Sequence, residues 1–147
     1  MTTISTDCRH YRISFPCAPH KQRRVACEQC TDYDRLQERI LIVKLDAMGD
    51  VLRTTTCLPA LKRLYPRSHI TWLTRANAAP LLAGNPAIDR VLSVESNYLE
   101  FLLAEEFDLV LSPDADLLPA SIAGLARAAT KRGFVSNGRG DIVPIDD

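Results

Sequence analysis

The chain has 147 residues, a formal net charge of zero and an apolar content of 46%. This length suits one domain with a small appendage, and the balanced charge argues against a chain built to bind nucleic acid. No apolar run approaches the roughly 20 residues that cross a bilayer, and no secretory signal is visible. We therefore expect a cytoplasmic protein that contacts a membrane peripherally at most.

The first 34 residues are predicted to form a Cys-rich, metal-binding leader. The spacing of Cys27 and Cys30 lets two thiolates hold one tetrahedral ion. In the cytoplasm such a cluster is more typical of metal binding than of disulfides. Because little apolar surface is present, a metal would supply the missing stability. We expect a structural zinc, since four sulfurs leave no open coordination position. The candidate ligands are four thiols, with two histidines as alternates: Cys8, Cys17, Cys27 and Cys30, then His10 and His20.

Two other interpretations of the leader stay open, namely a disordered segment with reactive thiols and a redox pair. The redox pair is disfavoured because Cys27 and Cys30 do not open a helix in a βαβ unit. The basic run at residues 20–24 could contact phosphate groups, but no aromatic side chain is interleaved with it. We expect this run to be a solvated loop and residues 31–38 to be a linker.

From residue 39 onward, short apolar runs alternate with segments of helical spacing. The predicted strands cover residues 40–45, 69–74, 90–94, 107–111 and 131–135. The predicted helices cover residues 51–55, a restart near Pro59 that ends at Pro66, and residues 77–83, 98–104 and 117–129. Leu58, Leu61, Leu64 and Tyr65 are expected to face the sheet. Residues 133–145 read as a strand and a turn that run out in the middle of a fold. The pattern predicts a doubly wound α/β domain over residues 39–147, with strand order 3-2-1-4-5.

The turn after the first strand, residues 46–50, lies at the edge of the sheet where ligands bind. It contains one glycine, Gly49, and neither the glycine-rich dinucleotide fingerprint nor a phosphate-loop lysine. Two interpretations of Asp50 stay open. It is either a helix N-cap that accepts hydrogen bonds from the first N–H groups, which would lower its pKa, or an ionised general base for a hydroxyl group.

Four motifs lie in this region: Gly49-Asp50-Val51, Thr56-Cys57-Leu58-Pro59-Ala60-Leu61, Ile70-Thr71-Trp72-Leu73 and Asn85-Pro86-Ala87-Ile88-Asp89-Arg90-Val91. Together they resemble the start of glycosyltransferase family 9, the bacterial ADP-heptose:lipopolysaccharide heptosyltransferases. The second motif carries one residue more than the family's form. The resemblance spans residues 39–114, and the leader resembles a segment that precedes this domain in a subset of relatives.

The resemblance implies the N-terminal, acceptor-binding half of a two-domain GT-B fold. It also implies inverting sugar transfer without a catalytic metal, from a nucleotide-sugar donor of the ADP-heptose type to lipopolysaccharide core or a related surface glycan. Asp50 corresponds to the base that deprotonates the acceptor hydroxyl. Lys44, Asp46, Met48 and Gly49 would line the same turn and bind substrate. Three interpretations of Lys44 stay open. Its charge could balance that of Asp50, its ammonium group could contact a phosphate of the acceptor, or its side chain could simply extend from the strand end into water.

The chain stops at Asp147, where the family continues into a donor-binding domain. We therefore expect an acceptor-side fragment that is inactive alone, unless another chain supplies the donor half. The alternative is a zinc-stabilised α/β binding module without catalytic activity. A nucleotide-binding redox enzyme is a third interpretation, which the missing glycines weaken.

Overall fold

The computed structural model describes residues 3–11, 16–96 and 98–145. The chain forms two compact units, Met1–Gln37 and Glu38–Asp147, and each is described by itself below. None of the described helices combines the length and the apolar character that crossing a membrane requires.

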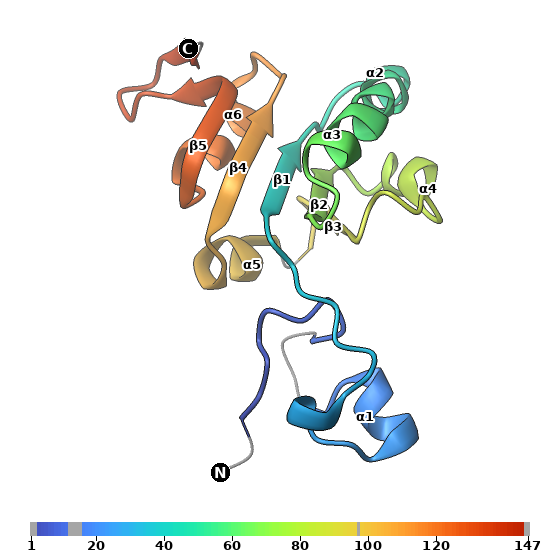
Figure 1. Cartoon of the computed structure of the whole chain (residues 1–147). Helices are drawn as coiled ribbons and strands as arrows, with labels where there is room; N and C mark the ends of the chain where they lie inside the picture. Colours follow the sequence, from blue (N-terminus) through green and yellow to red (C-terminus); the bar gives the residue numbers. More distant parts are fainter. Residues whose placement is uncertain (1–2, 12–15, 97, 146–147) are drawn as a thin grey trace. The chain divides into compact units, whose positions relative to one another are not determined.

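The larger unit is built on a six-stranded sheet with the order β3-β2-β1-β4-β5-β6 (Figure 1). The strands are β1 (Arg39–Val43), β2 (His69–Thr74), β3 (Arg90–Ser93), β4 (Phe107–Ser112), β5 (Ala128–Ser136) and β6 (Ile142–Ile145). The first five run parallel to their neighbours, and β6 pairs antiparallel with β5. The predicted fold class and the predicted order of the first five strands are confirmed.

Helices cover both faces of this sheet. They are α2 (Met48–Thr54), the short 3₁₀ helix η2 (Thr55–Cys57), α3 (Leu58–Leu64), α4 (Ala79–Leu82), α5 (Tyr98–Ala104) and α6 (Leu117–Leu125). Figure 1 shows α2, α3 and α4 on one side of the sheet and α5 and α6 on the other. This is the doubly wound arrangement, in which each strand-to-strand crossover places its helix on one face.

Alternate residues of β1 supply two separate cores. Ile40 and Ile42 pack in a cluster with Trp72 of β2 and with the buried faces of α2, α3 and α4. Leu41 and Val43 pack in the opposite cluster, which includes buried side chains of α5 and α6. All four β1 side chains are buried. A strand that is buried on both faces reads as a continuous apolar run, which is why the sequence marks it so clearly.

The first helical segment differs from its prediction in its starting residue and in the exposure of one leucine. It begins at Met48 rather than at residue 51. It breaks at η2 and restarts at α3 with Pro59 in the first turn, as predicted. Leu64, which was expected to face the sheet, is 72% exposed. That expectation was wrong because Leu64 lies roughly a quarter turn away from the buried stripe of Leu58, Leu61 and Tyr65.

One prediction near the C-terminus was also wrong, and another was incomplete. The helix expected over residues 117–129 ends at Leu125, because Ala128 already pairs with Phe107 in the β4–β5 ladder and tertiary pairing overrides the helix propensity of alanine. Residues 133–145 contain the expected strand and turn, but the prediction left out the second strand. A turn with Gly138 and Gly140 at positive φ returns the chain, so that β6 pairs with β5.

The smaller unit has little regular structure. It contains α1 (Ala18–Arg23), the 3₁₀ turn η1 (Cys27–Gln29) and an isolated antiparallel bridge between Cys8 and Arg35. The basic run expected to be a loop lies largely in α1, since Pro19 favours a helix start. The prediction that residues 31–38 form a linker was also wrong. The Leu36 N–H donates to the carbonyl oxygen of Asp7 at 2.8 Å, and the Leu36 side chain is buried, so this segment is part of the smaller unit.

Gly133 provides a test of the β4–β5 packing. Its φ is +95°, and an added Cβ would lie 2.7 Å from the carbonyl carbon of Ser112 on β4. Gly138 has a similar φ of +77° but open space around it, so it is a matched control. We expect Gly138→Ala to lose about 1 kcal/mol of unfolding free energy from backbone strain, and Gly133→Ala to lose about 3 kcal/mol or more. Urea unfolding measures both, and equal losses would contradict the packing described.

His69 provides a second test. Burial lowers its pKa to about 4, and the nearby Arg90 and Arg39 lower it while Asp89 and Glu105 raise it. An unfolded histidine has a pKa of about 6.5, so between these values the unfolded chain binds more protons than the folded one. The contribution of His69 to stability is therefore complete above about pH 6.5. As the pH falls to about 4, the protein loses about 3 kcal/mol of unfolding free energy through this residue.

The measurement is urea unfolding across this pH range for the wild type and for His69→Gln. We expect the variant to show a shallower fall in unfolding free energy between pH 6.5 and 4. An identical slope in the two proteins would show that His69 does not titrate as described.

Candidate functional site

A cavity of about 380 Å³ opens at the carboxyl ends of β1 and β4. These two strands are parallel neighbours, and the chain winds outward from them in opposite directions, toward β2 and β3 on one side and β5 on the other. This is the switch point at which open α/β sheets bind ligands. The residues that line the cavity are Lys44, Asp50, Arg53, Thr54, Pro113 and Asp114.

A buried ion pair forms the inner wall of the cavity. Lys44 follows β1, and its Nζ donates to Oδ1 of Asp114 and to the carbonyl oxygen of Asp46. Oδ2 of Asp114 accepts the Leu45 N–H at 2.9 Å. Both side chains are only 8% exposed. The side chain of Asp114, which follows β4, thus bonds to two residues at the end of β1. These contacts fix the position of the end of β4 relative to the end of β1.

Asp50 lies on the rim, in the first turn of α2. Its side chain is 44% exposed and pairs with Arg53, whose Nη2 donates to Oδ1. This hydrogen bond and the charge of Arg53 hold the pKa of Asp50 below its usual value, and Lys44 lowers it further. The carboxylate is therefore ionised near neutral pH and reachable from the cavity.

The N-cap interpretation of Asp50 was wrong. Ala47 occupies the N-cap position of α2, and the Asp50 N–H donates to its carbonyl oxygen at 2.9 Å. The pKa of Asp50 is lowered as that interpretation expected, but the cause is Arg53 and not the free N–H groups of the helix.

The other residues predicted for this turn do not line the cavity. Asp46 is exposed and accepts a hydrogen bond from Nε of Arg75 at 2.7 Å. Met48 and Gly49 are exposed in the first turn of α2. The structure therefore brings together two of the five predicted residues, Lys44 and Asp50.

Four lining residues were missed by the sequence analysis: Arg53, Thr54, Pro113 and Asp114. A signal existed for Asp114, because the predicted strand order places the end of β4 beside the end of β1. Arg53 could have been found from its spacing of three residues after Asp50, which brings two side chains together on a helix. Thr54 follows one position later, and its hydroxyl donates to the carbonyl oxygen of Asp50 at 2.7 Å.

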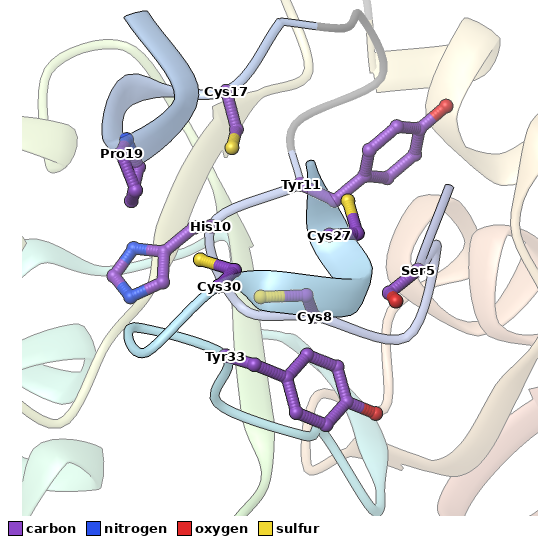
Figure 2. Close-up of a pocket in the computed structure, with 9 residues that line it drawn as sticks. All are labelled: Ser5, Cys8, His10, Tyr11, Cys17, Pro19, Cys27, Cys30 and Tyr33. Carbon is purple, nitrogen blue, oxygen red and sulfur yellow. The ribbon is translucent and has the colours of Figure 1, made fainter. Parts of the chain in front are cut away.

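The predicted metal ligands lie in the smaller unit. Cys8, Cys17, Cys27, Cys30 and His10 line one pocket of about 20 Å³ (Figure 2). His20 does not line it, and its Nδ1 lies 2.7 Å from the carbonyl oxygen of Val25. All four thiols are free of disulfides. As the side chains stand, no three Cys, His, Asp or Glu residues in the described part of the chain are arranged to hold a metal ion.

Solved glycosyltransferases share this fold. A glycosyl transferase of family 9 from Veillonella parvula DSM 2008 aligns with 69% of this chain at a TM-score of 0.61 and 23% identity. The heptosyltransferase WaaC of E. coli, solved with ADP, aligns with 65% of the chain at a TM-score of 0.58 and 28% identity. The same enzyme with ADP-2-deoxy-2-fluoro heptose aligns with 65% at a TM-score of 0.56 and 25% identity.

The match covers between 33% and 36% of those proteins, so the chain spans about a third of their length and corresponds to their N-terminal portion. No family model and no curated protein matches the sequence. The structural matches confirm both the resemblance and the GT-B-like fold of the larger unit.

The Lys44–Asp114 pair provides a test of how the cavity wall is built. Asp114→Asn keeps an oxygen for the Leu45 N–H but leaves the Lys44 ammonium buried without its charge partner, so we expect a loss of about 3–5 kcal/mol of unfolding free energy. Adding Lys44→Met removes that buried charge, and the double variant should recover at least half of the loss. Urea unfolding of the full cycle measures the coupling, and additive losses would contradict a buried pair.

Proposed function

We propose that residues 39–147 form the acceptor-binding domain of an inverting glycosyltransferase and that Asp50 is its general base. One observation carries the proposal. An ionised, accessible carboxylate stands at the mouth of a cavity at the switch point of the sheet, in a fold that matches heptosyltransferases.

In the proposed reaction, an acceptor hydroxyl enters the cavity and donates a hydrogen bond to Asp50. Its oxygen attacks the anomeric carbon of the donor sugar from the face opposite the nucleoside diphosphate. As the new C–O bond forms, the bond to the diphosphate breaks and the hydroxyl proton passes to Asp50. A single displacement of this kind inverts the anomeric centre. The negative charge that develops on the diphosphate needs cationic or N–H groups on the donor side.

Arg53 has a defined part in this scheme. By lowering the pKa of Asp50 it keeps the base deprotonated, but it also weakens the base. The Arg53 side chain is 82% exposed, so a phosphate or carboxylate group on the acceptor has free access to its guanidinium. We propose that an anionic acceptor draws Arg53 away from Asp50 and thereby restores the basicity of the carboxylate.

Lys44 has a different part. Its Nζ already donates to Asp114 and to the carbonyl oxygen of Asp46, and its side chain is buried. We therefore propose that Lys44 shapes the cavity wall and favours the ionised form of Asp50. Binding of an acceptor phosphate, which the sequence left open for Lys44, is not part of this proposal.

The proposed donor is a nucleotide sugar of the ADP-heptose type, because the E. coli neighbours were solved with ADP and with an ADP-heptose analogue. The proposed acceptor is lipopolysaccharide core or a related surface glycan, approached at the cytoplasmic face of the inner membrane. A donor-binding domain, in the same or another chain, would complete the site, and the domain described would not transfer sugar without it. No catalytic metal takes part in the proposed reaction.

A chimera tests the role of Asp50. In it, residues 39–147 replace the matched N-terminal portion of E. coli WaaC, and ADP release is followed with ADP-heptose and a lipopolysaccharide-core acceptor. We expect Asp50→Asn to lower kcat by about 10²- to 10⁴-fold, since the variant side chain cannot accept the proton. Acceptor affinity, measured by calorimetry, should change by less than about threefold because the two side chains have the same shape.

Asp46→Asn is the matched control. It removes a carboxylate from the same turn, but from a residue outside the cavity, so its kcat should stay near that of the unsubstituted chimera. A chimera in which Asp50→Asn and Asp46→Asn retain equal activity would overturn the assignment. The chain itself, titrated with the acceptor and followed by amide chemical shifts, should show saturable changes at Asp50, Arg53 and Asp114.

A further inference from the structure

The described residues of the smaller unit form no apolar core that could hold it folded. Among its described residues, the buried side chains are Cys8, Pro19 and Leu36. The regular structure of these described residues is one helix of six residues, one 3₁₀ turn and one isolated bridge. Units below about 40 residues usually need disulfides, a metal or a partner for stability. Some other interaction must therefore stabilise this fold.

Four thiols from separate segments line the same small pocket. Cys8 lies at the bridge to Arg35, Cys17 immediately precedes α1, and Cys27 and Cys30 stand at the two ends of η1. The pocket holds about 20 Å³, which is room for one water-sized or ion-sized occupant. Figure 2 shows the sulfur atoms of Cys8, Cys17 and Cys30 turned toward the enclosed space and that of Cys27 turned aside, near Tyr11.

The chemistry of the lining suits a soft or borderline cation. No Asp or Glu side chain is among its lining residues, and sulfur is the dominant donor. Thiolate ligands select Zn²⁺ and similar ions over Mg²⁺ or Ca²⁺. Residues 1–37 carry six Lys and Arg residues against four Asp and Glu residues, a net charge of +2. A Zn²⁺ ion held by four thiolates carries −2, so the surrounding charge balances it.

We propose that Cys8, Cys17, Cys27 and Cys30 bind one structural Zn²⁺ ion as thiolates. Binding replaces four S–H bonds with four Zn–S bonds and releases four protons, with no change of oxidation state. As the side chains stand, no three of these residues are arranged to hold a metal ion, so binding requires the cysteine side chains to turn until the four sulfurs converge. Because the ligands come from all parts of the unit, the free energy of binding becomes free energy of folding. This inference is independent of the proposed function.

The two histidines are outside the proposed ligand set. His20 is off the pocket and its ring nitrogen is engaged with the carbonyl oxygen of Val25. His10 lines the pocket, but its ring is turned to the side in Figure 2. The four sulfurs complete a tetrahedral site without either.

The experiment uses the full chain, purified under reducing conditions, stripped with a chelator and titrated with Zn²⁺ and with Co²⁺ as a spectroscopic probe. We expect one equivalent of metal per chain and release of about four protons per Zn²⁺ near pH 7. The Co²⁺ complex should show the visible bands of a tetrahedral site and sulfur-to-cobalt charge transfer. Absence of binding in the reduced chain would overturn the proposal, as would disulfides found among these four cysteines in protein isolated under nonreducing conditions without metal.

Variants then identify the ligands. Cys27→Ser and Cys30→Ser should each weaken Zn²⁺ binding by more than about 100-fold. Cys57→Ser is the matched control, since Cys57 lies on η2 of the other unit, and it should bind like the wild type. His10→Ala should also bind like the wild type, and a loss equal to that of Cys27→Ser would overturn the four-sulfur assignment.

Limited proteolysis of the wild-type chain tests the proposal even where a cysteine variant fails to fold. In the wild-type chain, the chelator should expose residues 16–36 to protease while cleavage within residues 38–145 stays unchanged. Equal protection of the smaller unit with and without the chelator would contradict a structural metal.

Discussion

Two buried charges, those of Lys44 and Asp114, set the geometry on which the candidate site depends. Removing charges from water is costly, and the cost is offset only where each charge has its partners in place. Lys44 has Asp114 and the Asp46 carbonyl, and Asp114 has Lys44 and the Leu45 N–H. Every one of these groups lies just beyond β1 or β4. The ends of the two strands therefore cannot separate without leaving a buried charge unpaired, and the inner wall of the cavity is held rigid.

The ion pair at the rim of the cavity differs from the inner pair because it is exposed to water. The Asp50–Arg53 pair is exposed to water on both sides, and exposed pairs of this kind contribute little to stability. Exchanging Arg53 for a different partner therefore costs little, while the same exchange at Lys44 would leave Asp114 unpaired in a buried position. A fixed wall and an exchangeable rim suit a site that must position an acceptor and still let its base change partners during the reaction.

The sequence predicted the sheet well because its signals are local. The run from Ile40 to Val43 is apolar at every position, which marks a strand buried on both faces, and connection rules then give the strand order. The errors concern features that depend on distant partners. Ala128 belongs to β5 because of Phe107, and β6 exists because β5 offers it an edge. Asp114 was missed although the predicted strand order places β4 beside β1, because its role also depends on where its side chain reaches from the end of β4. Lys44 and Asp50, in contrast, follow one strand in the chain.

The smaller unit shows the same division between local and distant information. The spacing of Cys27 and Cys30 is a local signal, and it predicted a thiol cluster. Cys8 and Cys17 were also named as candidate ligands, and the structure places all four cysteines around one pocket. The pairing of Leu36 with Asp7, which makes the expected linker part of the unit, is a property of the fold that the sequence did not predict. The larger unit has two apolar cores built from its own residues. A metal in the leader would then act locally, because its binding free energy would be spent on ordering the residues that hold it.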